Sequence, residues 1–301
     1  MRCVAFIGYG QLAAALAGGL ADGGIDLRAY VRPRPDRAAA DARRNRMRAT
    51  GVRHCEAVSD AVGGADVVIA AVPAGSAADV VEACVPHLLP AQLYVDPSSS
   101  PPAMKRRAAE LVEHAGAEYV DAAVLGTVIT AGARVPILAA GRGAARWCDE
   151  ACAVGLNVTA IDAPAGDAAL VKLLRSVFTK GRDALVLEML LAARRHGVLD
   201  AVLDSIGGAS EQVPFPSLAE RTMCSLAVYA ERRADELAAA TSLLREVDVD
   251  PLMTEAGESR LRLFADSGLQ DLFGGERPQD LNQVLSCLDA LESASPADKP
   301  A

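Results

Sequence analysis

The first half of the chain alternates short hydrophobic runs with longer amphipathic segments rich in alanine. The hydrophobic runs have the length and composition of buried β-strands, and they cover residues 3–7, 27–31, 67–72, 93–95, 119–123 and 136–139. The segments between them predict helices near 11–21, 33–49, 76–88, 101–115 and 144–153. Strands that alternate with helices form a mainly parallel sheet covered by helices, and residues 155–162 are a candidate for one more edge strand.

From residue 167 onward the hydrophobic positions recur with the helical period instead. The pattern predicts helices at 167–195, 199–206, 217–245, 251–265 and 280–292. We therefore expect the α/β class, with a doubly wound Rossmann domain over 1–164 and an all-α domain over 165–290 that begins with a long inter-domain helix. Residues 291–301 lack a hydrophobic pattern and predict a disordered tail.

A glycine-rich loop, Gly8-Tyr9-Gly10-Gln11-Leu12-Ala13, directly follows the first predicted strand and opens a helix. It fits the dinucleotide fingerprint, in which the first glycine allows a tight turn and the second lets the pyrophosphate approach the backbone. The alternative is a packing turn in another kind of α/β protein, but the strand before and the helix after supply the context that the motif requires. The predicted cofactor-binding residues in and near this loop are Gly8, Tyr9, Gly10, Gln11, Leu12, Val72 and Pro73.

The end of the second strand bears on the choice of cofactor. An NAD enzyme places a carboxylate there for the ribose hydroxyls, whereas this chain has Tyr30-Val31-Arg32-Pro33-Arg34, and Asp26 lies at the opposite end of the strand. Arg32 and Arg34 have the geometry to hold a 2′-phosphate by forked hydrogen bonds; the alternative is a solvated loop. We predict that NADP(H) is preferred over NAD(H).

The composition narrows the functional classes. The 301 residues are 51% hydrophobic and carry a net charge of −9, which favours a soluble protein and disfavours a nucleic-acid or membrane surface. The glycines that interrupt the apolar N-terminus favour a strand and helix over a signal peptide. The seven cysteines and four histidines are dispersed, which predicts reduced thiols in a cytoplasmic protein and no metal site.

An unusual group of polar residues interrupts the apolar helix predicted at 167–195. Lys172, Arg175, Ser176 and Lys180 share one face, about 140° wide at 100° per residue. Either this is a solvated face, or it forms the wall of a site that binds an anion. Its position directly after the sheet domain favours the second interpretation, because clefts between domains are preferred ligand sites.

Four segments in order along the chain carry a resemblance to a known family. They are the glycine loop, Asp96-Pro97-Ser98-Ser99, Asp121-Ala122-Ala123-Val124-Leu125-Gly126-Thr127, and Gly166-x5-Lys172-x2-Arg175-Ser176. With these segments the chain resembles the β-hydroxyacid dehydrogenase superfamily, which includes 3-hydroxyisobutyrate and 6-phosphogluconate dehydrogenases. The last segment is similar to a divergent 6-phosphogluconate-dehydrogenase-like subgroup.

The resemblance implies roles for individual residues. Lys172 would be the general acid or base, with a pKa lowered by burial and by Arg175 and Lys180. Ser176 would orient the substrate oxygen, and Ser99 would lie beside the nicotinamide. The substrate loop would comprise Leu125, Gly126 and Thr127, although the family has serine and glycine where this chain has leucine and threonine. Arg175 and Lys180 would bind a carboxylate, phosphate or phosphonate.

The activity expected from this resemblance is NADP(H)-dependent interconversion of a hydroxyl and a carbonyl on a small anionic substrate, by a homodimer. An imine reductase of related architecture is one alternative, although those enzymes commonly have Asp or Tyr in place of Lys172. A non-catalytic NADP(H)-binding sensor is another, because the substrate loop departs from the family pattern. Arg221 and Tyr229, on a later helix, either close the substrate pocket or form surface contacts with nearby acidic residues.

Overall fold

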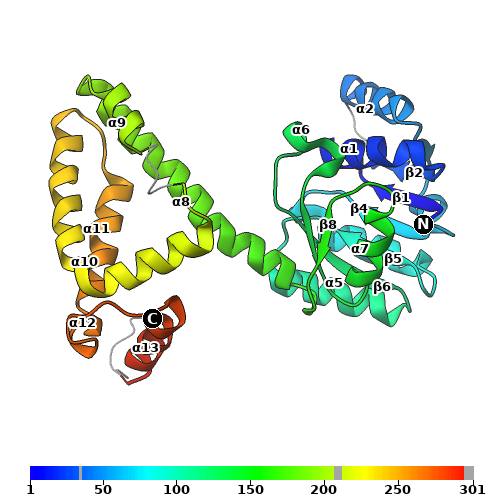
Figure 1. Ribbon diagram of the computed structural model, residues 1–301. Coiled ribbons are helices and arrows are strands. Elements are labelled where there is room, and N and C mark those ends of the chain that lie inside the picture. The colour runs from blue at the N-terminus through cyan, green and yellow to red at the C-terminus, as the bar shows by residue number, and fades with distance from the viewer. Residues whose placement is uncertain (34–35, 207–211, 295–301) are drawn as a thin grey trace. The chain divides into compact units, whose positions relative to one another are not determined.

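The computed structural model describes residues 1–33, 36–206 and 212–294 (Figure 1). The chain divides into two compact units, Met1–Ser176 and Val177–Ala301. The division falls inside helix α8 (Asp167–Arg195), later than the expected boundary at 164/165. The reason is that the start of α8 packs on the sheet: Ala168 and Ala169 are buried.

The first unit is built on an eight-stranded sheet with the order β3-β2-β1-β4-β5-β6-β7-β8. The sheet is parallel except where β6 pairs with β7. Its strands are β1 (Cys3–Ile7), β2 (Asp26–Tyr30), β3 (Arg53–Cys55), β4 (Val67–Ala70), β5 (Leu93–Asp96), β6 (Glu118–Val124), β7 (Ile137–Ala140) and β8 (Val158–Ala160). Because the chain turns from β3 back to β4 beside β1, the order reverses between β1 and β4, where open α/β sheets bind ligands.

Helices cover both faces of this sheet through two hydrophobic clusters. One cluster joins α1 (Gln11–Leu20) and α7 (Ala144–Cys152) to one face. The other joins α3 (Val58–Val62), α4 (Ala77–Cys84) and α5 (Pro102–His114) to the opposite face. Two further helices, α2 (Arg37–Ala49) and α6 (Val128–Ala131), complete the α-helices of this unit before α8. The predicted Rossmann-type sheet and the helical region that follows it are both confirmed.

Some elements escaped the hydrophobic pattern. Strand β3 has three residues, of which only Cys55 is buried, so it lacks the alternation that marks a strand. Helices α3 and α6 are too short to show a helical period. The antiparallel pairing of β7 with β6 is a departure from the parallel remainder.

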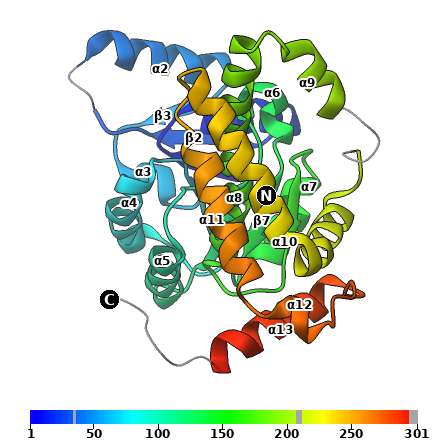
Figure 2. The ribbon, with the colours of Figure 1, turned by 90° about the vertical axis from the view of Figure 1, so that its left-hand side faces the viewer.

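The second unit consists of helices in the part that the structure describes. They are the remainder of α8, then α9 (Leu199–Ile206), α10 (Phe215–Glu246), α11 (Leu252–Ala265), α12 (Leu269–Leu272) and α13 (Leu281–Ala294). Helices α10 and α11 lie side by side (Figure 2), and α10 is kinked at Tyr229. Helix α13 continues to Ala294, past the expected boundary at 290, while 295–301 lie outside the described residues.

A buried carboxylate joins two helices of this unit. Glu188 of α8 accepts hydrogen bonds from the backbone N–H groups of Met253 and Thr254, at 2.6 and 3.1 Å, and from the Thr254 hydroxyl at 2.8 Å. These donors belong to the first turn of α11, where backbone N–H groups lack partners within the helix. The contact therefore caps α11 and fixes it to α8.

Candidate active site

A cavity of about 480 Å³ lies at the reversal point of the sheet, between the carboxyl ends of β1, β2 and β4. Its volume is within the roughly 300–1,000 Å³ range of small-molecule pockets. Six of the predicted cofactor residues line it: Gly8, Tyr9, Gly10, Arg32, Val72 and Pro73. The other predicted cofactor residues of this region, Gln11 and Leu12, form the first turn of α1, and Leu12 packs on the core.

The two glycines of the loop differ in what their missing side chains allow. Gly8 has φ +85°, and a Cβ there would lie 2.6 Å from the carbonyl oxygen of Ala71, so the fold itself requires glycine. At Gly10 no atom of the described chain lies within 4 Å of where a Cβ would be. The absence of a side chain at Gly10 is therefore not explained by packing within the protein, and it leaves the N-terminus of α1 open to a phosphate group.

Tyr9 lines the pocket, and its ring is held in the interior. The ring is buried, packs edge-to-face on Phe6 at 5.9 Å and exchanges a hydrogen bond with the Thr50 hydroxyl. Burial raises the pKa of its phenol above the ordinary value. Tyr9 thereby anchors the glycine loop to the end of α2.

Arginines line the side of the pocket next to β2. Arg32 is exposed there, as the sequence led us to expect, and Arg34 lies outside the described residues. The structure adds Arg43 and Arg46 of α2, which the sequence analysis did not identify. The signal that marks them is the dense basic run R-R-N-R-M-R at 43–48, in the first helix after the strand whose end bears on cofactor choice.

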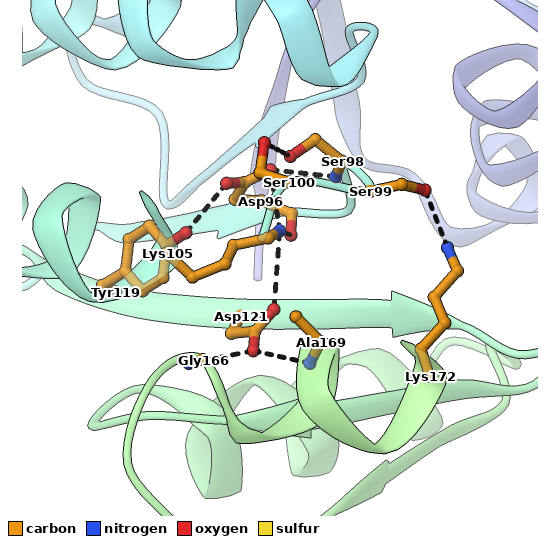
Figure 3. Close-up of polar contacts among 10 residues, drawn as sticks. All are labelled: Asp96, Ser98, Ser99, Ser100, Lys105, Tyr119, Asp121, Gly166, Ala169 and Lys172. Carbon is orange, nitrogen blue, oxygen red and sulfur yellow. Dashed lines mark hydrogen bonds and ion pairs between the residues drawn. The ribbon is translucent and has the colours of Figure 1, made fainter. Parts of the chain in front are cut away.

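A second group of polar residues lies on β5 and β6, which are parallel neighbours with Asp96, the last residue of β5, paired to Asp121 in the middle of β6 (Figure 3). At its centre is Lys105 of α5, which is completely buried. Its ammonium lies 3.1 Å from Asp96 Oδ1 and 3.4 Å from Asp121 Oδ1, and it donates to the Asp96 carbonyl oxygen at 2.6 Å. The Tyr119 hydroxyl donates to Asp96 Oδ2 at 2.8 Å. Buried charges are found where they are paired in this way.

The sequence analysis also missed Lys105, although its pattern marks the residue. Ala108, Ala109 and Val112 form the buried face of α5, and Lys105 precedes them at the i, i+3, i+4, i+7 spacing. A lysine on a buried stripe needs partners of opposite charge. Its nearest carboxylates belong to the two adjacent strands: Asp96 ends β5, and Asp121 lies in the middle of β6.

Asp121 connects this group to helix α8. Its Oδ2 accepts hydrogen bonds from the backbone N–H groups of Gly166 at 3.0 Å and Ala169 at 2.9 Å (Figure 3). These are two of the donors left unpaired at a helix start, and a carboxylate there also interacts favourably with the helix dipole. The first turn of α8 is therefore fixed to β6.

One turn further along α8, the half-buried Lys172 donates from Nζ to the hydroxyl oxygen of Ser99 at 3.0 Å. This contact joins two segments that are 73 residues apart in sequence. Burial is the main cause that lowers the pKa of Lys172; the charge of Lys105 lowers it further, and Asp121 opposes the shift. The expected cause was wrong in one respect: the repelling charge is Lys105, not Arg175 or Lys180.

The remaining predicted residues of α8 are arranged as follows. The Ser176 hydroxyl donates to the backbone carbonyl of Lys172 at 2.9 Å, so its proton is engaged within the helix. Arg175 is exposed. Lys180 belongs to the second unit and forms an exposed ion pair with Asp183 at 3.5 Å. Of the residues on this face, the structure thus joins Lys172 to Ser99, and Ser176 to Lys172.

The predicted substrate loop follows directly from the end of β6. Leu125 is fixed by a backbone hydrogen bond to Pro136 at 2.8 Å and packs against a small cluster that includes Ala168 of α8. Gly126 and Thr127 are exposed. A Cβ on Gly126 would lie 3.2 Å from Pro136. The loop emerges beyond Asp121, on the strand next to the one that leads to Ser99.

The described residues contain neither a candidate metal cluster nor a candidate membrane span. No cluster of three or more histidine, cysteine or acidic side chains is arranged to hold a metal ion within 1–33, 36–206 and 212–294. In the same ranges, no helix is both long and apolar enough to span a membrane.

Two segments of the chain match known domain families. Residues 3–148 match the NAD binding domain of 6-phosphogluconate dehydrogenase, and residues 193–264 match a domain of unknown function, DUF1932. A conserved protein of unknown function, whose structure is described as similar to 3-hydroxyacid dehydrogenases, is 30% identical; the match covers 91% of this chain and 98% of that one, with a TM-score of 0.59. A conserved hypothetical protein from Sinorhizobium meliloti 1021 is 28% identical, with 97% of each chain covered and a TM-score of 0.60.

Imine reductases share the fold at lower identity. The enzyme from Myxococcus stipitatus in complex with NADP+ is 17% identical over 95% of this chain and 99% of that one, with a TM-score of 0.72. A variant of it was solved with NAD+, at 18% identity, 96% and 99% coverage and a TM-score of 0.73. The protein belongs to the β-hydroxyacid dehydrogenase-like superfamily, with an N-terminal NAD(P)-binding Rossmann domain followed by a helical region.

Proposed function

We propose that this protein is an NADP(H)-dependent oxidoreductase that interconverts a hydroxyl and a carbonyl on a small anionic substrate, with Lys172 as the general acid or base. The observation that supports this most is the 3.0 Å hydrogen bond between Lys172 Nζ and Ser99 Oγ. It brings together the two family segments expected to carry the reacting proton and to lie beside the nicotinamide. A lysine with a lowered pKa can both donate and accept a proton near neutral pH.

The chain's own residues have separate tasks in this reaction. The bound cofactor supplies or accepts the hydride. Lys172 gives a proton to the carbonyl oxygen during reduction and takes one from the hydroxyl during oxidation. Ser99 orients the ammonium, since its hydroxyl oxygen accepts from Nζ. Ser176 keeps acceptor lone pairs while its proton is bound to the helix backbone, which suits it to accept a hydrogen bond from a substrate hydroxyl other than the one that gives its proton to Lys172.

The proposed preference for NADP(H) rests on the arginines around the pocket. Arg32, Arg43 and Arg46 line one cavity, and guanidinium groups recognise phosphate by paired hydrogen bonds. Related structures hold NADP+ and also NAD+, so the preference is a proposal about this chain's own residues. For the anionic part of the substrate, we propose Arg175 and Lys180, together with the loop at 125–127.

We also propose that the protein works as a homodimer. In the second unit α8 exposes large hydrophobic side chains, among them Val177 at 73% and Leu187 at 61%. Apolar surface of this extent is typical of protein–protein interfaces. Light scattering of the purified protein tests this, and a monomer at micromolar concentration would contradict it.

An imine reductase is the second candidate, because imine reductase structures share the fold. The two structures from Myxococcus stipitatus do so with TM-scores of 0.72 and 0.73. A lysine can protonate an imine nitrogen as well as a carbonyl oxygen, so the identity of the substrate distinguishes the two candidates. A sensor that binds NADP(H) without turnover is the third candidate.

The experiment follows absorbance at 340 nm with NADPH or NADP+ against a panel of oxo acids, hydroxy acids and cyclic imines. The proposal predicts turnover with an acidic oxo or hydroxy compound and a KM for the NADP form at least tenfold below that for the NAD form. Turnover of imines alone would favour the second candidate. Cofactor binding without turnover of any compound would favour the sensor.

A further inference from the structure

We propose that Lys105 is a positioning residue for Lys172: by joining Asp96 to Asp121 in the interior, it holds the Ser99 loop and the start of α8 in register. This deepens the proposed function, because it names the residue that prepares the proposed acid/base. Lys105 belongs to none of the four family segments, and it does not contact the cofactor pocket.

Lys105 lies between Asp96, at the end of β5, and Asp121, in the middle of β6. Asp96 is the last residue of β5, and its Oδ1 also accepts the backbone N–H of Ser98 at 2.9 Å. Ser98 in turn shares a hydrogen bond with Ser100 at 2.9 Å. Both serines are buried, and they flank the exposed Ser99. The ion pair at Asp96 therefore supports the turn that presents Ser99 to Lys172.

The buried negative charge of Asp121 is balanced by the Lys105 ammonium. Asp121 is completely buried, and its two oxygens have different partners. Oδ2 caps α8, whereas Oδ1 accepts no hydrogen bond within the described residues and is balanced there by the Lys105 ammonium at 3.4 Å. An uncompensated carboxylate in the interior is costly. Without Lys105, the charge that fixes the start of α8 would lose its counter-charge.

Neighbouring charges also affect the pKa of Lys172. Two charged groups on neighbouring elements act on its ammonium, Lys105 on α5 and Asp121 on β6. Asp96 on β5 is paired with Lys105. On its own helix the nearest charges are Asp167 and the exposed Arg175. Lys105 lowers the pKa of Lys172 and Asp121 raises it. A buried cation near the proposed acid/base thus favours the neutral amine.

A purely structural role for Lys105 makes a different prediction. If the ion pairs only hold the sheet together, a variant that still folds leaves the proton affinity of Lys172 unchanged. The test therefore measures that affinity directly and needs no substrate. Competitive labelling with trace acetic anhydride across pH, read by mass spectrometry, gives the pKa of each lysine separately.

The chain suits this measurement because it has four lysines, at 105, 172, 180 and 299. Lys105 is buried and should react only on unfolding, which reports integrity. Lys180 is exposed on the same helix and serves as the internal reference. In the wild type we expect the labelling curve of Lys172 to reflect a pKa below the ordinary value of lysine, because burial lowers it.

Two variants shift Lys172 in opposite directions. In Lys105→Met its labelling curve should move to higher pH, so that reactivity at a fixed pH below the pKa falls roughly three- to tenfold, as expected when a neighbouring like charge is removed. In Asp121→Asn, which keeps an oxygen to accept from α8, the curve should move to lower pH. Lys105→Arg keeps the charge and should stay near the wild type.

An unchanged Lys172 curve in a folded Lys105→Met protein would overturn the proposal. If Lys105→Met does not fold, Asp121→Asn decides alone, and a shift to higher pH or no shift would overturn it. The outcome is separate from that of the proposed function. If the labelling curves shift as predicted but no compound of the panel is turned over, the inference about Lys105 stands and the proposed dehydrogenase activity is contradicted.

Discussion

The glycine-loop pocket and the lysine site lie on the same sheet but are built in different ways. The pocket depends on backbone and on missing side chains: Gly8 fits only as glycine, and Gly10 leaves space that the protein does not fill. The lysine site depends on side chains that carry charge into the interior, with Lys105 completely buried between Asp96 and Asp121. The pocket is formed by residues that lack side chains, whereas the lysine site is formed by paired charges.

Substitutions in the two sites should therefore have different effects. In the pocket, binding and folding can be separated residue by residue, because the two glycines serve different purposes. In the lysine site, Asp121 serves the helix cap and the charge balance at once. We therefore expect substitutions there to change folding, geometry and proton affinity together.

The largest expected effect is on turnover. Lys172→Ala should lower kcat about 10²–10⁴-fold, the usual effect of removing a general acid/base, while the Kd for NADPH stays within about twofold. Steady-state kinetics and fluorescence titration of the cofactor measure the two quantities. Arg107→Ala, an exposed residue of α5 paired only with Glu110 among the described residues, is the matched surface control. A kcat within a factor of three of the wild type would contradict the assignment.

The two glycines sharpen the comparison next. Gly8→Ala should lower the free energy of unfolding by roughly 2–4 kcal/mol, because it adds a positive-φ penalty to a clash with backbone. Gly10→Ala should leave stability within about 1 kcal/mol, since φ is −92° and the space is open. Its NADPH affinity should instead fall by about tenfold or more. Urea unfolding and cofactor titration separate these outcomes, and equal destabilisation by both substitutions would break the comparison.

The arginines of the pocket should affect one cofactor and not the other. Arg46→Ala and Arg32→Ala should each raise the Kd for NADPH about tenfold, as expected when a charge-assisted hydrogen bond worth about 1.5–3 kcal/mol is removed. The Kd for NADH should change less than twofold, because NADH has no 2′-phosphate. Isothermal titration calorimetry with both cofactors checks this. Parallel weakening of both would indicate that the arginines hold the shared pyrophosphate.

The smallest expected effect is a difference in pH dependence between the two reaction directions. Reduction needs protonated Lys172, so its rate should fall as pH rises through the lowered pKa. Oxidation needs neutral Lys172, so its rate should rise through the same pH range. Initial rates in both directions, with saturating substrate, give the two limbs. Limbs of the same sign in both directions would exclude Lys172 as their origin.

The sequence predicted the pocket better than the lysine site for a physical reason. The glycine loop is contiguous, and its chemistry depends on local backbone, so the order strand, glycines and helix was sufficient. Helices α8 and α9 were also predicted at their observed bounds, because their hydrophobic positions recur with the helical period. Local patterns are readable wherever local geometry decides the outcome.

The interior network was less readable because its partners are far apart in sequence. Lys105 on α5 pairs with Asp121 on β6, the strand that follows. Ser99 and Lys172, which share a hydrogen bond, are 73 residues apart in sequence. The helical period places Lys105 on a buried face of α5. That Asp96 and Asp121 both lie beside it follows only from the pairing of β5 with β6. Arg43 and Arg46 likewise became pocket residues through the placement of α2.

The central claim is that Lys172 carries the proton, and chemical rescue tests it most directly. Lys172→Ala, saturated with NADPH and the best substrate of the panel, is assayed with increasing concentrations of small primary amines. We predict that the rate rises with amine concentration and that its pH dependence follows the pKa of the added amine. A Lys172→Ala protein that binds NADPH normally and turns over at the wild-type rate, with no response to any amine, would contradict the account.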